Sequence, residues 1–85
     1  MTVAMLPNIR EFEPRLKAEE PKERIKAIND LTKTIESLPV NDKTKPLINK
    51  GMKLLGDMGV NEKDEKVKMA AQKAFKELAS HERFR

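Results

Sequence analysis

The segment DEKVKMAAQKAFKEL, residues Asp64–Leu78, carries small apolar side chains three and four residues apart, the spacing of one face of an α-helix. These side chains are Val67, Ala70, Ala71, Ala74, Phe75 and Leu78. Alanines allow two helix axes to approach toward the lower end of the ~8–10 Å range. We therefore expect this helix to pack closely against the helix before it, with Val67, Phe75 and Leu78 filling the ends of the contact.

Two helical patterns lie in the first half of the chain. The clearer one begins at Pro21, a residue suited to a first helical turn, and continues for about four turns with apolar side chains at Ile25, Ile28, Leu31, Ile35 and Leu38. The weaker one is formed by Met5, Ile9, Phe12 and Leu16. Because Pro14 lies inside the weaker pattern, we expect that helix either to begin late or to be kinked.

Residues 37–46, SLPVNDKTKP, predict a loop in which Asp42 or Thr44 caps the next helix. The third helix has its apolar residues at Leu47, Ile48, Met52, Leu55 and Met58. Gly51 inside it indicates that a neighbouring backbone approaches closely, and Gly59 is expected in the left-handed conformation just after its end. Asn61 and Asp64 resemble a capping box for a fourth helix running from about Glu62 to Ser80.

The chain of 85 residues is long enough for one domain with a small core. No run of alternating β-branched and aromatic residues predicts a strand. We expect a single helical domain over residues 1–85, with a weakly ordered first helix in 1–20 and a frayed tail at 80–85. The predicted fold class is all-α, with four helices forming two stacked helical hairpins.

The two halves of the sequence match each other at a separation of 43 residues. At that separation six apolar positions coincide, pairing Met5 with Ile48, Ile9 with Met52, Phe12 with Leu55, Ile28 with Ala71, Leu31 with Ala74 and Ile35 with Leu78. A separation of 44 instead pairs Arg24 with Lys68, Ala27 with Ala71 and Leu31 with Phe75, so the register stays open. Either period falls in the ~40–47 residue range of helical-hairpin solenoid repeats.

Residues Pro46–Ala79 resemble a HEAT repeat. The first helix ends in Leu54, Leu55 and Asp57, like the family's Leu-Leu-x-Asp. The second helix is similar to the family's Val-Arg-x-x-Ala-x-x-Ala-Leu-x-x-Leu, with Lys68 in place of the Arg and Phe75 in place of the Leu. The resemblance implies two stacked HEAT-like hairpins and a protein-binding role.

Two further resemblances concern the first half. Residues Glu19–Ile35 are similar to the corresponding helix of TOG-type HEAT arrays, which bind tubulin, although Pro21 stands where those domains carry a Trp. Residues Arg24–Leu47 resemble the leucine-tryptophan domain of transcription elongation factors, in the order helix, Leu-Pro-Val turn and Thr-Lys. The second resemblance implies an unrelated four-helix fold.

Composition limits the chemistry and the setting. The sequence has no cysteine and one histidine, His81, which excludes a structural zinc site of the usual kind. No nucleophile, paired carboxylate or glycine-rich loop stands in a catalytic pattern, so we expect neither an enzyme nor a cofactor. The absence of disulfides in so small a domain favours an intracellular location, in cytoplasm or nucleus, and no segment predicts a membrane span.

A lysine-rich segment is the candidate binding site. It contains Lys43, Lys45, Lys50 and Lys53, with one acid, Asp42, just before them and none between them. We expect Lys22 and Lys26 on the second helix to extend the patch. The net charge is +4. Such a surface can meet an acidic protein or a phosphate backbone. No aromatic residue and no arginine lies between these lysines, so the segment lacks the side chains that usually stack on nucleic-acid bases or read their edges.

We therefore expect a non-enzymatic protein–protein interaction module, a scaffold or regulatory adaptor, that engages another, acidic protein through a basic helix surface. The alternative is a small basic nucleic-acid-associated protein that binds through phosphate contacts. A small regulatory protein that occupies one surface of a host protein is a third class. Because the ends of a solenoid need caps or further repeats, oligomerisation through an uncapped repeat face is also compatible with the sequence.

Overall fold

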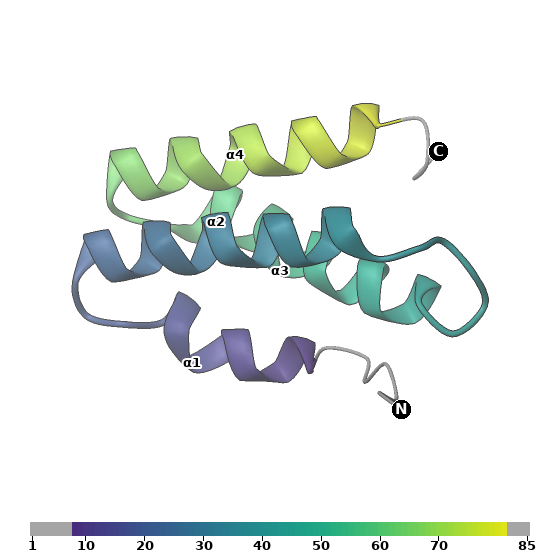
Figure 1. The fold of residues 1–85 in the computed structure, drawn as a ribbon. Coiled ribbons are helices and arrows are strands. Elements are labelled where there is room, and N and C mark those ends of the chain that lie inside the picture. The colour runs from purple at the N-terminus through teal and green to yellow at the C-terminus, as the bar shows by residue number, and fades with distance from the viewer. Residues whose placement is uncertain (1–7, 82–85) are drawn as a thin grey trace.

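The computed structural model describes residues 8–81 and contains four α-helices preceded by one 3₁₀ turn (Figure 1). The elements are η1 (Ile9–Glu11), α1 (Phe12–Leu16), α2 (Pro21–Ser37), α3 (Lys45–Asn61) and α4 (Glu65–Ser80). Within these residues no strand occurs. The all-α, four-helix prediction is thus confirmed, whereas the expected roles of Met5 and of the tail after His81 lie outside the described residues.

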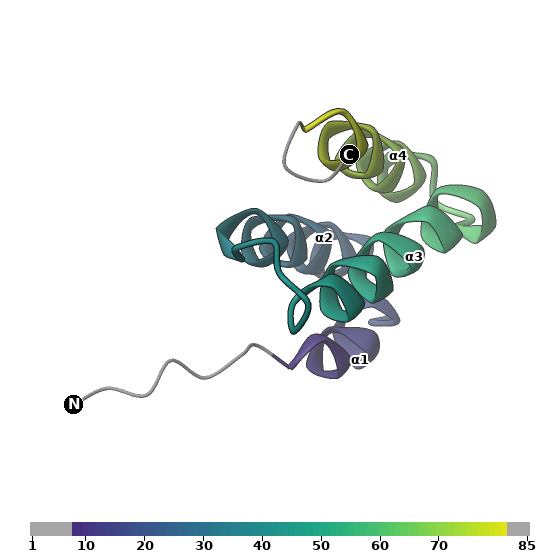
Figure 2. The ribbon, with the colours of Figure 1, turned by 90° about the vertical axis from the view of Figure 1, so that its right-hand side faces the viewer.

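The helices form two antiparallel pairs, α1 with α2 and α3 with α4 (Figure 1). The pairs meet mainly through α2 and α4, which run in the same direction side by side, while η1 contacts α3. Figure 2, which looks nearly along α2 and α4, shows α4 above α2 and α1 below it, with α3 on the right of α2, sloping up toward the level of α4. The chain therefore reverses direction at each of the three connections.

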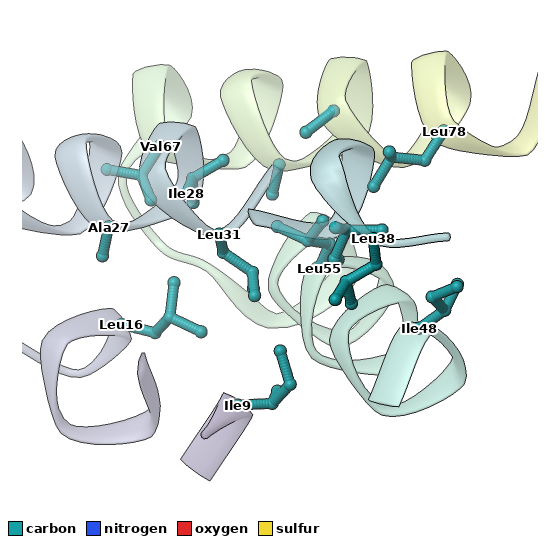
Figure 3. Packing of buried hydrophobic residues seen from close by; sticks show 13 residues of the cluster. Ile9, Leu16, Ala27, Ile28, Leu31, Leu38, Ile48, Leu55, Val67 and Leu78 are labelled. Atoms are coloured by element: carbon teal, nitrogen blue, oxygen red, sulfur yellow. The ribbon is translucent and has the colours of Figure 1, made fainter. Parts of the chain in front are cut away.

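All four helices and η1 contribute to one core (Figure 3). Its buried apolar residues are Ile9, Leu16, Ala27, Ile28, Leu31, Ile35, Leu38, Ile48, Leu55, Val67, Ala71, Ala74 and Leu78. They follow the predicted apolar faces closely, because burial of these faces is the main driving force that such a small domain has. Ile9 and Leu16, from η1 and α1, close the core from below α2 in Figure 3.

The first helix begins late, as Pro14 indicated. Asn8 caps η1 by accepting a hydrogen bond from the Arg10 amide at 3.1 Å, and α1 then ends at Leu16. Proline has no amide hydrogen and is tolerated only in the first turn of a helix, where Pro14 lies in α1. As a result α1 covers only part of the length of α3.

The alanine face of α4 packs as predicted, but against two helices. Ala71 is fully buried and Ala74 nearly so, and α4 contacts both α3 and α2. Phe75 departs from the prediction, since it lies over Gly56 of α3 with 37% of its surface exposed. It therefore covers the edge of the contact and does not fill its interior.

Several predicted caps are wrong. No glycine in residues 8–81 has a positive φ, and Gly59 lies buried inside α3, where its carbonyl accepts a 2.7 Å hydrogen bond from Gln72 Nε2. The sequence pattern misled because a glycine that admits a neighbouring helix looks the same as one that ends a helix. Asp64 alone caps α4, accepting from the amides of Lys66 and Val67, so α4 begins at Glu65 and not at Glu62.

Gly51 does mark a close approach, though not of a backbone. A Cβ at this position would lie 2.5 Å from Ile35 Cδ1 and 3.6 Å from Leu31 Cδ1, both side chains of α2. The glycine therefore lets α2 side chains enter the surface of α3.

Candidate partner-binding surface

Lys43 and Lys45 are held by a hydrogen-bonded turn at the start of α3. The side chain of Asn41 accepts from the amides of Lys43 and Thr44, at 2.9 and 3.0 Å. Thr44 is fully buried, and its hydroxyl accepts from the Asn41 amide and donates to the Pro39 carbonyl. Thr44 holds the N-cap position of α3, but its side chain makes no capping hydrogen bond to the helix. The Asn41 side chain instead fixes the turn that leads into α3, where the exposed lysines Lys43 and Lys45 lie.

Lys50 and Lys53 project from the next turns of α3 beside carboxylates of other segments. Lys50 Nζ lies 3.3 Å from Oε1 of Glu13 in α1, and both side chains are about two-fifths exposed. Lys53 is exposed and shares a shallow depression with Glu13 and Asp57. The run of lysines is therefore partly neutralised once the chain folds, which the linear spacing did not reveal.

Lys22 and Lys26 were predicted to extend this patch, but the structure places the start of α2 at the opposite end of α3 from Lys43 and Lys45. Arg24, which lies between them, pairs with Glu62 just after the end of α3, with 2.9 Å between Nη2 and Oε1. The start of α2 therefore lies beside the end of α3, whereas Lys43 and Lys45 lie at the start of α3, about 25 Å of helix away. Because α2 and α3 run antiparallel and one loop joins them, the lysines at the start of α2 lie far from those at the start of α3.

Arg24 joins three segments at this end of the molecule. Its Nη1 donates to the carbonyls of Ala18 and Glu19, at 2.6 and 2.9 Å, while Nη2 bonds Glu62. The two charged side chains are only 15% and 11% exposed, and Glu62 also accepts a 3.3 Å hydrogen bond from the Asp64 amide. The pair therefore fixes the α1–α2 and α3–α4 connections to each other.

A separate basic cluster surrounds Asp30 on the outer face of α2. Arg15 Nη2 donates to Asp30 Oδ2 at 2.6 Å, and this hydrogen bond is the main reason that the pKa of Asp30 lies below its ordinary value of 3.8. Partial burial opposes that shift, while the charges of Arg15, Lys26 and Lys33 reinforce it. Lys26 therefore belongs electrostatically to this cluster and not to the α3 lysines.

A depression runs between α1 and α3, and we call it the α1–α3 furrow. It consists of an open groove of about 600 Å³ and a smaller hollow, and both are lined by Glu13, Leu54 and Asp57, so they are continuous along α3. Apolar side chains in it are Leu16, Leu54 and Met58. Lys50 and Lys53 border one end, and Lys17 and Lys63 border the other.

The furrow exists because α1 is short. Five residues of α1 lie beside seventeen of α3, so Leu54 and Met58 remain only partly buried at the edge of the core. Lys17, Lys63 and Leu54 were not predicted as site residues. The sequence signal for the furrow was the pair Pro14 and Pro21: Pro14 is tolerated only in the first turn of a helix and Pro21 begins the next one, so any helix around Pro14 has to be short.

The described hydroxyl side chains form hydrogen bonds to the main chain. The five hydroxyl side chains in residues 8–81 each donate to a main-chain carbonyl; they belong to Thr32, Thr34, Ser37, Thr44 and Ser80. No cluster of three or more potential metal ligands is found in that part of the chain. Nor does any described helix have the length and apolar character needed to cross a membrane.

Comparison with known proteins adds no family or fold relative. No protein-family model matches the sequence, and neither a curated protein nor a solved structure matches it significantly.

Proposed function

We propose that this chain is a non-enzymatic protein-interaction module that binds an acidic partner through the basic side of α3. The observation that carries the proposal is the run of four lysines, Lys43, Lys45, Lys50 and Lys53, along α3 and the turn before it, of which Lys50 and Lys53 border the α1–α3 furrow. A positive surface beside apolar side chains suits a protein partner, since charges steer the encounter and apolar contact holds it. The chain would then act as a scaffold or regulatory adaptor inside the cell.

The use of the hydroxyls supports the non-enzymatic part of the proposal. A nucleophile needs a base within hydrogen-bond reach and a free path to a substrate. The described hydroxyls donate to backbone carbonyls instead, as Thr32 does to Ile28 at 2.7 Å.

A HEAT-like relation is part of the same proposal. It is supported by the stacking of the α1–α2 pair on the α3–α4 pair through α2 and α4. The starts of α2 and α4, at Pro21 and Glu65, are 44 residues apart, which favours the second of the two repeat registers. Exposed Val60 and Phe75 on the α3–α4 pair would then belong to a repeat face open to oligomerisation.

Nucleic-acid association is the second candidate, and a different surface favours it. Exposed lysines lie on the neighbouring helices α2 and α4, at Lys22, Lys26, Lys33, Lys66 and Lys73. Lysines on two neighbouring helices can together contact a phosphate backbone without reading bases.

Affinity capture from lysate separates the two candidates. The purified chain would be used with and without nuclease, beside a variant with Lys43, Lys45, Lys50 and Lys53 changed to Glu and a control with Lys22, Lys26, Lys66 and Lys73 changed to Glu. The proposal predicts a protein that survives nuclease, is lost with the first variant and is retained by the control. Recovery that nuclease abolishes, or that only the control loses, would favour nucleic-acid binding and contradict the proposal.

A further inference from the structure

We infer that the α1–α3 furrow is the docking site for a single amphipathic helix of the partner, with acidic side chains at both ends of its apolar face. This inference rests on the proposed function and assigns the partner's chemistry and position. It follows from the shape, the charge and the floor of the furrow.

The shape suits a helix. From Asn49 to Asn61 the furrow extends along thirteen residues of α3, a rise of about 18 Å at 1.5 Å per step, which matches about three helical turns. A trough between two helices accepts a third helix by ordinary helix packing. A peptide that binds by adding a strand would need a sheet edge, and residues 8–81 contain no strand.

The charges at the furrow select an acidic occupant. Five cations and three carboxylates line it, which leaves a surplus of two positive charges. Arg24 and Glu62 are paired with each other, and Lys50 is paired with Glu13. What remains is Lys53 at one end, Lys17 and Lys63 at the other, and Asp57 between them.

The floor argues against a nucleic acid in the same place. Leu16, Leu54 and Met58 are apolar, and the lining contains no aromatic side chain on which a base could stack. A phosphate backbone would leave the floor uncovered, whereas leucine-like side chains of a helix would bury it. Met58 adds a flexible side chain that adapts to different apolar partners.

A peptide-display selection tests the inference with a defined probe. A library of random 16-residue peptides would be selected on the purified chain, and the strongest binder would be synthesised and its affinity measured. We expect enrichment of peptides with apolar residues three and four apart and with Asp or Glu near both ends. Failure to enrich any peptide, or enrichment of basic peptides, would overturn the furrow assignment.

Two pairs of matched variants locate the binding. Lys53→Glu with Lys63→Glu should weaken the peptide's affinity at least about 10-fold, whereas Lys22→Glu with Lys26→Glu makes the same charge change on exposed α2 residues and should have little effect. Leu54→Ala should also weaken it about 10-fold, whereas Met69→Ala, at a 62% exposed residue of α4, should not. If Leu54→Ala unfolds the chain, the comparison of the two lysine double variants alone decides whether the peptide binds in the furrow.

The outcomes separate the inference from the proposed function. If lysate capture still depends on the α3 lysines but the peptide's affinity is unchanged by the variants at Lys53, Lys63 and Leu54, the interaction role stands and the furrow assignment fails. If lysate capture finds only nucleic acid, the proposed function fails, and a peptide that nonetheless binds as described would leave the furrow as a protein-binding site.

Discussion

Gly51 of α3 lies directly against Ile35 of α2, so close that a Cβ on Gly51 would be 2.5 Å from Ile35 Cδ1 and 3.2 Å from its Cγ1. Ile35 is fully buried, so its side chain has little room to move. This contact sets how closely α2 and α3 approach, and hence how the lysines of α3 are placed relative to the rest of the domain.

Changing Gly51 to Ala should therefore destabilise the fold even though Ala favours helices by about 1 kcal/mol. Overpacking a dense core costs about 1–3 kcal/mol, so a net loss of about 1 kcal/mol is expected in urea unfolding. Adding Ile35→Val, which removes Cδ1, should recover part of that loss. Gly56→Ala is the matched control: its Cβ would meet only the Phe75 ring, 3.3 Å away and partly exposed, so we expect a small gain. A more stable Gly51→Ala protein would contradict the packing.

Ala71 offers a second test of the core. It is fully buried where α4 meets α2 and α3, so Ala71→Leu should cost about 1–3 kcal/mol. Ala79→Leu makes the same change at an exposed position of α4 and should change the free energy of unfolding little. Equal melting temperatures for the two variants would refute the assignment of the alanine face.

The Arg24–Glu62 pair should contribute more than the other described ion pairs. Arg24→Ala would leave a largely buried Glu62 carboxylate without this partner and remove two bonds to loop carbonyls, so a loss of about 3 kcal/mol is expected. The double variant with Glu62→Ala should lose less than the two single variants added together. Arg15→Ala, which breaks an exposed pair, is the comparison and should lose far less. Equal losses at Arg15 and Arg24 would be inconsistent with this account.

The lowered pKa of Asp30 predicts a defined pH dependence. Since its folded-state pKa lies below 3.8, its contribution to stability is present above that pH and is lost as the pH falls through the folded-state pKa. An NMR titration of the Asp30 carboxyl should give a midpoint below 3.8, and Arg15→Gln should raise it toward the ordinary value. If the midpoint is the same in the Arg15→Gln variant, the hydrogen bond from Arg15 is not the cause of the lowered pKa.

Periodicity sufficed to predict most of the fold. The apolar faces of α2, α3 and α4 were correctly predicted because most side chains that recur at helical spacing are buried in the core or packed against it, Phe75 being an exception. Helix ends were harder to predict from the sequence, and Gly59 and Asp64 were misassigned. Capping depends on which side chains lie near a helix terminus, and Gln72 lies next to Gly59 only in the folded chain.

The candidate site was only partly predictable. The spacing of Lys43 to Lys53 identified the basic side of α3, but it could not show that Glu13 folds back onto Lys50 or that Lys22 and Lys26 lie at the other end. The furrow depends on the place where α1 ends, and that is a tertiary property of Leu16 and its neighbours. Short helices are set by what they pack against more than by their own sequence.

NMR mapping would show which surface of the chain binds a partner. The ¹⁵N-labelled chain would be titrated with the selected acidic peptide and, separately, with a random-sequence DNA duplex at physiological salt. We expect the peptide to shift the amides of Lys50, Lys53, Leu54 and Met58 at sub-stoichiometric to equimolar ratios, and DNA to cause only weak shifts that vanish as salt rises. Saturable DNA binding through Lys22, Lys26, Lys66 and Lys73, with no peptide-induced shifts on α3, would contradict this expectation.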